Sequence, residues 1–407
     1  MSGDGLRGQP VSSRIADLYQ RLAPLISFFT ESAWADRQGQ PGISDFVAGN
    51  PQEPPLPAFV ETLQRWAVPQ RNDWFAYRPN DDDARAAVAA VLRERRGLPF
   101  EPEDVFMTTG AFGALAAAFR AVADPGDEIV YVSPPWFFYD SMIRFAGADP
   151  VRVDSRAPGF DLPVDAIAAA ITPRTRAVIV NSPNNPTGRI YPAEALEVLA
   201  KLLTDASARA GRPIYLISDE AYSRILFDGR AFLSPTAFYD HSFLVYTFGK
   251  TLLTPGQRLG YLALAPGMPD KEQVRGAVFL SQIAAGFAFP NAVLQFAVAE
   301  LEELTIDIAH LQRKRDRMVS ALREMGYELG VPEATFYLLP QSPIPDDFGF
   351  TELLANQDVF VLPGSLFELS GYFRISLTAS DEMIDRALPV FASAVQEAQS
   401  SLSAPRS

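Results

Sequence analysis

The sequence has no cysteine, and its 407 residues include only two histidines, His241 and His310. Without cysteine the chain can form neither disulfides nor thiolate nucleophiles, and most zinc sites are excluded as well. Two histidines far apart in the sequence make a histidine-based metal centre improbable. We therefore expect no metal site.

Positive charge is also scarce. The 35 Lys and Arg residues stand against 49 Asp and Glu, which gives a formal net charge of -14. Phosphate backbones bind to clustered basic side chains, so we expect no nucleic-acid partner. The one dense basic stretch, residues 313–317, contains Asp316 and is typical of a solvated helix face.

Long apolar runs are missing too. No run approaches the roughly 18 residues of a membrane-spanning helix, and residues 1–10 lack the basic and apolar regions of a signal peptide. We therefore expect a cytoplasmic protein without a membrane partner.

The pattern that is present alternates helices with short apolar runs. Runs without polar alternation predict parallel strands buried on both faces of a sheet. The fold class expected from this rhythm is α/β, with a mostly parallel central sheet and helices on both faces. The predicted strands cover residues 128–132, 177–180, 214–217 and 243–246, and the predicted helices cover residues 81–96, 114–123 and 192–210.

A second, smaller α+β domain is predicted towards the C-terminus. Residues 291–326 have the pattern of one long helix or a bent pair, and shorter strands and a final helix at about residues 380–399 follow. We expect an N-terminal arm and part of the small domain in residues 1–48, a large domain in residues 49–290, and a long interdomain helix with the small domain in residues 291–407.

Chemically informative residues follow the predicted strands. Trp136, Asn185, Asp219 and Lys250 each come shortly after one of the four runs. Ligands of open α/β sheets bind beyond the carboxyl ends of the strands. These four residues are therefore expected to meet at one edge of the sheet.

Five segments together resemble the class I/II aminotransferases, which belong to fold type I of the pyridoxal-phosphate (PLP) enzymes. The segments are residues 133–139, 181–188, 218–222, 246–261 and 372–376. The resemblance implies a large PLP-binding domain with a smaller second domain, and a homodimer with active sites at the subunit interface. It also implies small-molecule substrates, an amino acid and a 2-oxo acid.

Within this resemblance, three residues are expected to be catalytic. Lys250 would form a Schiff base with PLP and then act as acid and base. Asp219 would pair with the pyridine nitrogen and keep it protonated. Tyr222 would hydrogen-bond the phenolic oxygen of the ring, together with Asn185.

Further residues are expected to bind the cofactor or the substrate. Trp136 would stack on the ring. Backbone amides at the start of a helix would bind the phosphate, aided by a guanidinium and a hydroxyl, and Arg374 would grip the substrate carboxylate through paired hydrogen bonds. The phosphate-binding set is Gly110, Ala111, Phe112, Thr247 and Arg258, with Tyr77 reaching the phosphate of the neighbouring subunit, and the substrate-binding set is Gly49, Asn185 and Arg374.

Two departures from the family pattern bear on the reaction. The stretch after Tyr77 is short and acidic. Phe112 stands where dicarboxylate-specific relatives can carry a lysine, and an aromatic ring cannot pair with a side-chain carboxylate. We therefore expect a neutral or aromatic L-amino acid as the donor, with ping-pong transfer of its amino group to a 2-oxo acid.

Two other functions remain open from the sequence. The same site could serve a PLP-dependent lyase, racemase, decarboxylase or oxidase, because these reactions form the same carbanion. A PLP-binding regulator of transcription is disfavoured, because the roughly fifty residues before Gly49 carry no basic recognition helix.

Overall fold

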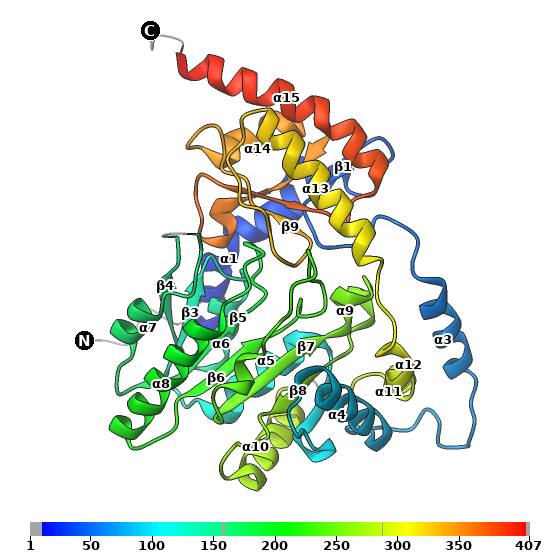
Figure 1. Ribbon diagram of the computed structural model, residues 1–407, viewed down its shortest axis with the longest axis vertical. Helices are drawn as coiled ribbons and strands as arrows, with labels where there is room; N and C mark the ends of the chain where they lie inside the picture. The colour runs from blue at the N-terminus through cyan, green and yellow to red at the C-terminus, as the bar shows by residue number, and fades with distance from the viewer. Residues whose placement is uncertain (1–9, 157–158, 287, 404–407) are drawn as a thin grey trace.

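A seven-stranded sheet forms the centre of the computed structural model, which describes residues 10–156, 159–286 and 288–403. Figure 1 shows this sheet in the lower part of the molecule. In spatial order its strands are β2 (Val105–Thr108), β8 (Gly260–Leu264), β7 (Ser242–Thr247), β6 (Tyr215–Asp219), β5 (Thr175–Asn181), β3 (Glu128–Ser133) and β4 (Asp149–Asp154).

The sheet is mostly parallel, as predicted. β3 pairs in parallel with both β4 and β5, and the parallel pairing continues through β6 to β7. β8 runs antiparallel to both of its neighbours, β7 and β2. The four predicted strands correspond to β3, β5, β6 and β7, so their carboxyl ends lie along one edge.

Both faces of the sheet are buried by helices, which explains the continuous apolar runs. In β7 the side chains of Phe243 and Val245 pack on one face, and those of Leu244 and Tyr246 pack on the other. The first face is covered by α5 (Gly110–Val122), α6 (Tyr139–Ala146) and α10 (Lys271–Ala284). The opposite face is covered by α3 (Pro57–Ala67), α4 (Asp82–Arg96), α7 (Val164–Ala170), α8 (Ala193–Ala210), α11 (Ala292–Phe296) and α12 (Val298–Leu301).

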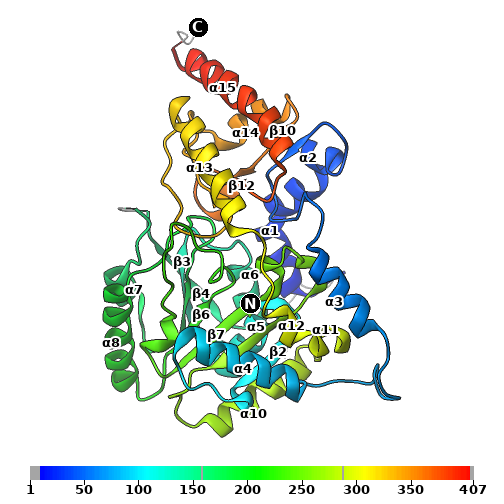
Figure 2. The same ribbon diagram turned by 45° about the vertical axis from the view of Figure 1, so that its right-hand side comes forward.

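A second group of elements lies above the central sheet in Figures 1 and 2 and draws on both ends of the chain. Near the N-terminus, β1 (Ser44–Asp45) pairs in parallel with β10 (Val359–Phe360). The antiparallel strands β11 (Leu362–Pro363), β12 (Phe373–Ser376) and β9 (Tyr337–Leu338) form a further small sheet. The helices of this group are α2 (Ala33–Arg37), α13 (Ile308–Glu324), α14 (Asp347–Ala355) and α15 (Asp381–Ser403), while α1 (Ser13–Glu31) runs from it down to contact α6. The predicted domain ranges also include residues 1–9 and 404–407, which lie outside the described residues.

The prediction of one long helix or a bent pair over residues 291–326 was wrong, because the helical structure there is interrupted. The structure has the short helices α11 and α12, an irregular segment, and then α13. The side chain of Asp307 accepts a hydrogen bond from the His310 amide and so caps a new helix start. The amide of Ile306 donates instead to the carbonyl of Thr251, which fixes the break.

The basic stretch at residues 313–317 is not a simple solvated face, which corrects that expectation. The side chains of Lys314 and Arg315 are only 3% and 2% exposed. Arg315 forms two 2.7 Å hydrogen bonds to the carboxylate of Asp228. Lys314 Nζ lies 2.7 Å from Glu53 Oε2. These buried cations join α13 to loops from distant parts of the chain.

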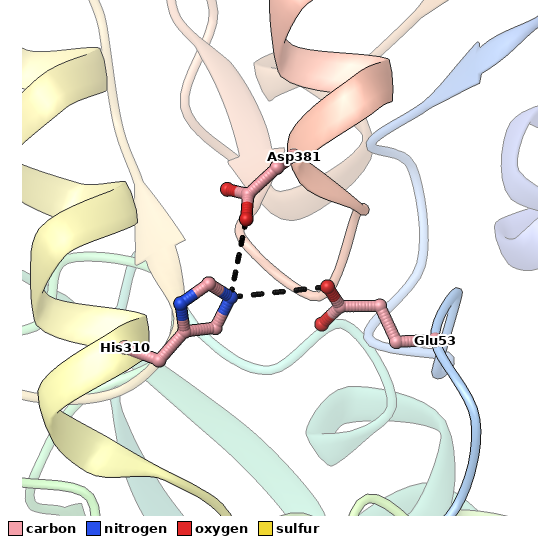
Figure 3. A group of neighbouring side chains, drawn as sticks. All are labelled: Glu53, His310 and Asp381. Carbon is pink, nitrogen blue, oxygen red and sulfur yellow. Dashed lines mark ion pairs between the residues drawn. The ribbon is translucent and has the colours of Figure 1, made fainter.

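Next to Lys314, a cluster of His310, Glu53 and Asp381 joins three segments (Figure 3). His310 Nε2 lies 3.4 Å from Asp381 Oδ2 and 3.8 Å from Glu53 Oε1. The other ring nitrogen, Nδ1, lies 3.4 Å from a guanidinium nitrogen of Arg313. The ammonium of Lys314 supplies the positive charge next to Glu53, and we interpret the cluster as a set of polar contacts that fixes the starts of α13 and α15.

None of the helices within the described ranges is both long enough and apolar enough to cross a membrane.

Candidate functional site

A pocket lies at the carboxyl edge of the central sheet, where the sequence predicted one. It is bounded by the residues that follow β3, β5, β6 and β7, together with the first turn of α5. The lining residues are Ala111, Phe112, Trp136, Asn181, Asn185, Asp219, Ala221, Tyr222, Thr247, Gly249, Lys250, Pro255 and Arg258. Most residues of the predicted site are therefore brought together.

Lys250 differs from the other lysines of the chain in its surroundings. It lies in the short helix α9 (Phe248–Thr251), directly after β7, and its Nζ is 5.8 Å from the centre of the Tyr222 ring. The sequence has three more lysines, Lys201, Lys271 and Lys314, and each forms an ion pair with a carboxylate. Lys250 forms no ion pair with the residues that the structure describes, and its amine borders the same pocket as the carboxylate of Asp219.

Asp219 ends β6 and is buried, with 5% of its surface exposed. Burial raises the pKa of its carboxyl, although a hydrogen bond from Tyr139, the amide of Ala221 and the charge of Lys250 act in the opposite direction. The hydroxyl of Tyr139 donates to Asp219 Oδ2 at 2.5 Å. A buried carboxylate of this kind is suited to a ligand that brings its own positive charge.

Arg374, on β12, is also buried without an opposite charge. Its side chain donates to Asn185 Oδ1 and to the carbonyl of Val47, each at 3.0 Å, and the residue is 4% exposed. Its Nε is buried and has no hydrogen-bond partner among the described residues. No carboxylate in the described ranges pairs with Arg374, so its side chain takes no part in a structural salt bridge there. A carboxylate ligand would satisfy this guanidinium.

The first turn of α5 and the loop before β8 lie side by side and form a candidate anion-binding site. Gly110 begins α5 with φ +74°, and a side-chain carbon at this position would lie 3.0 Å from Arg258 Nη2. Arg258 donates to the carbonyls of Pro255 and Thr109. Thr247 Oγ1 donates to the carbonyl of Leu259 and accepts from the amide of Gly249. Free amides at a helix start beside a guanidinium suit a phosphate.

Aromatic side chains form one wall of the pocket. The rings of Phe112 and Trp136 are 4.6 Å apart and nearly perpendicular, and Phe138 lies 5.3 Å from Trp136. Phe112 is 38% exposed. The ring of Trp136 therefore borders the pocket from the side, in a position to contact a planar ligand.

Four predicted residues lie outside the lining of this pocket, namely Gly110, Arg374, Gly49 and Tyr77. Gly49 packs against the small antiparallel sheet, where an added side-chain carbon would lie 2.6 Å from Tyr337 Oη. Tyr77 is 93% exposed and contributes nothing to the pocket of its own chain.

Three residues at the site were missed as functional candidates from the sequence. Tyr139 contacts Asp219, Asn181 holds the amide of Asn185 with its Oδ1, and Tyr337 contacts Arg374. Tyr139 and Asn181 lie within segments that already pointed to the site, three residues after Trp136 and four before Asn185. The contact of Tyr337 is with a residue 37 positions further along the chain, so its nearness to Arg374 could not be inferred from sequence neighbours.

The buried charge of Asp219 predicts an unusual effect of the substitution D219N. Burial raises the pKa of this carboxyl in the folded protein above its pKa in the unfolded chain. The free energy of unfolding of wild type therefore falls as the pH rises from the unfolded-state pKa through the folded-state pKa. Cofactor-free D219N should therefore unfold at a higher temperature than wild type at pH 8, by about 2 °C or more.

This advantage of D219N should shrink as pH is lowered towards 4. Scanning calorimetry of cofactor-free protein measures both temperatures, and D165N, which removes an exposed aspartate, is the control. A cofactor-free D219N protein that unfolds at a lower temperature than wild type at pH 8 would contradict this account of the carboxylate.

Comparison with known proteins agrees with this arrangement. The sequence profile of the family "Aminotransferase class I and II" matches residues 42–391. The chain is similar to the aspartate/prephenate aminotransferase of Thermus thermophilus, with 35% identity over 363 residues that cover 86% of this chain and 90% of the relative. It is 31% identical to the aspartate aminotransferase of Thermotoga maritima, over 85% of this chain and 89% of the relative.

Solved structures show the same fold. An aminotransferase of Eubacterium rectale superposes with a TM-score of 0.84 and 30% identity, over 95% of this chain and 96% of that one. The structure of the Thermus thermophilus aspartate aminotransferase with maleate superposes with a TM-score of 0.78 and 30% sequence identity, over 95% of this chain and 100% of that one. The chain therefore belongs to the class I and II aminotransferases, a family of PLP-dependent transferases, and it is an aminotransferase.

Proposed function

We propose that this aminotransferase binds PLP at Lys250 and moves the amino group of a neutral or aromatic L-amino acid to a 2-oxo acid by a ping-pong mechanism. The observation that carries the proposal is the amine of Lys250, the one lysine among four without a carboxylate partner in the described ranges. It lies in the same pocket as Asp219 and Arg258, two residues that suit the two ends of the cofactor.

The residues present fit PLP at each of its polar groups. The buried Asp219 offers a negative charge for the pyridine nitrogen, and Tyr139 holds that carboxylate in place. The amides of Ala111 and Phe112, with Arg258 and Thr247, offer donors for the phosphate. When bound, the cofactor supplies an aldehyde carbon and a ring that withdraws electrons.

The chain itself would then bind the substrate and move a proton. Arg374 holds the α-carboxylate with its guanidinium, and Asn185, which already contacts Arg374, limits how the guanidinium can turn. The Nζ of Lys250 would be free to act as a base once the substrate amine has taken its place, and it would carry the proton of the substrate Cα. Tyr222, with Asn185, would hydrogen-bond the phenolic oxygen of the cofactor ring, and Trp136 would stack on that ring.

We also propose a homodimer with an active site completed across the interface. The 93% exposed Tyr77 lies in a loop whose Asn80 donates to Gln282 on α10. Near it, Leu280 is 66% exposed and Ile283 is 46% exposed on the same helix. An apolar surface of this kind suits a subunit contact and would let Tyr77 reach the partner's phosphate site. Asn80 and the helix cap Asp81 also give the short acidic loop a defined structure.

Mixing the PLP-loaded protein with an L-amino acid in the absence of a 2-oxo acid tests the reaction. We expect the absorbance of the aldehyde form of the cofactor to be replaced by that of its amine form, with release of one 2-oxo acid per site. In K250A the conversion to the amine form should be about 10²- to 10⁴-fold slower, because the side chain that carries the proton is lost. Ammonia or peroxide as the product, without the amine form, would indicate a different PLP reaction.

Replacing Phe112 tests the preference for the donor. F112K places an ammonium on the aromatic wall, and a charge-assisted hydrogen bond of about 1.5–3 kcal/mol should raise kcat/KM for aspartate relative to phenylalanine by about 10- to 150-fold. The matched variant F112L removes the ring without adding charge and should show no such gain. Steady-state kinetics with phenylalanine, methionine, leucine and aspartate give the ratios.

The competing possibility is an acidic donor, because the relatives compared above are named as aspartate or aspartate/prephenate aminotransferases. Wild-type protein that uses aspartate much faster than the neutral and aromatic donors would favour it, and our assignment of the aromatic wall would be wrong.

A further inference from the structure

Tyr337 lies against the buried guanidinium of Arg374. The guanidinium carbon is 4.0 Å from the centre of the Tyr337 ring, which places the cation over the aromatic face. Tyr337 is 3% exposed, and Arg374 is 4% exposed. Their contact is therefore shielded from water, where such an interaction is strongest.

The hydroxyl of Tyr337 points towards the other residues of the site. It accepts a hydrogen bond from the hydroxyl of Tyr222 at 3.5 Å, a long and weak contact. Burial alone would raise the pKa of Tyr337, but the charges of Arg374 and Lys250 outweigh it and lower the pKa. For Tyr222, burial and the neighbouring Tyr337 raise the pKa. Tyr222 is thus the donor and Tyr337 the acceptor of the pair.

The backbone leaves no spare room around Tyr337. At Gly49 an added side-chain carbon would lie 2.6 Å from Tyr337 Oη and 2.7 Å from the ring of Phe336. On its other side, Tyr337 pairs through β9 with Ser376 of β12, the strand that carries Arg374. Sheet pairing and close packing therefore hold the ring in one position.

These contacts leave Arg374 with a defined orientation and with an Nε that has no hydrogen-bond partner among the described residues. Asn185 and the carbonyl of Val47 hold its two terminal nitrogens, and the Tyr337 ring covers its flat face. A guanidinium whose plane is already fixed loses less conformational freedom when it binds a carboxylate through two parallel hydrogen bonds. Without the ring, Arg374 would keep its charge but lose the support for that plane.

We infer that Tyr337 is a positioning residue for substrate recognition, whose ring holds the plane of the Arg374 guanidinium for the α-carboxylate. This inference rests on the proposed function, because it takes Arg374 as the carboxylate-binding residue. The aromatic ring is the part of the side chain that performs this role, and the hydroxyl adds little to carboxylate binding.

Carboxylate binding without turnover tests the inference. Titration calorimetry measures the dissociation constant of 3-phenylpropionate, which has the carboxylate but no amino group, on the PLP-loaded protein. Removing the ring in Y337L should weaken binding by about 10-fold or more, the size of a desolvated cation–π contact. Y337F keeps the ring and should stay within about 3-fold of wild type.

A double-mutant cycle with R374K separates positioning from general disturbance. Lysine has no planar guanidinium, so R374K should weaken binding by itself, and in that background Y337L should cost less than about 3-fold. The control Y327L removes another buried tyrosine of the same hydrophobic cluster and should lower the unfolding temperature without changing the dissociation constant. If Y337L does not fold, Y337M fills similar space without a ring and takes its place.

Three results would overturn the inference. They are wild-type affinity in Y337L and Y337M, a loss in Y337F as large as in Y337L, or a loss from Y337L that is unchanged in the R374K background. The proposed role of Arg374 fails separately, if R374K alone binds 3-phenylpropionate like wild type. Because this result needs only R374K and wild type, it tests the role of Arg374 independently of the variants of Tyr337.

Discussion

Charged side chains that form no ion pair converge on one edge of the central sheet. Asp219 at the end of β6 and Arg374 on β12 are buried, Lys250 after β7 is half-buried, and none of the three forms an ion pair in the part of the chain that the structure describes. Other buried charges of the protein are closely paired, such as Arg315 with Asp228 and Asp104 with Lys271. Unpaired buried charge is costly, so its concentration here is best explained by a ligand that brings the complementary groups.

The surrounding fold explains why such a site is stable before any ligand binds. The strands that carry it are packed on both faces, and residues next to the charged groups are fixed by hydrogen bonds, as Tyr139 fixes Asp219 and Asn181 fixes Asn185. Arg374 comes from a different small sheet and reaches the pocket through Asn185. Carboxylate binding by Arg374 and proton transfer at Lys250 would therefore draw on two separately packed parts of the molecule, which a substrate would join.

Most of the central sheet could be predicted from the sequence, because parallel strands buried on both faces leave a local signal in apolar runs such as residues 243–246. The residues after those runs were also predictable, since strand direction places them together. What the sequence did not reveal depends on contacts between distant segments. The break before α13 required the cap of Asp307 to be recognised, and the burial of Lys314 required the loop that contains Glu53. Tyr337 could not be predicted because only the pairing of β9 with β12 brings it to Arg374.

Chemical identification of the lysine that binds PLP tests the central claim most directly. Borohydride reduction of the PLP-loaded protein fixes the cofactor to its amine, and digestion with mass spectrometry locates the adduct. The chain offers only Lys201, Lys250, Lys271 and Lys314 as candidate lysines. Our account predicts a single adduct, on Lys250. An adduct on one of the three paired lysines, or a protein that takes up no cofactor, would contradict it.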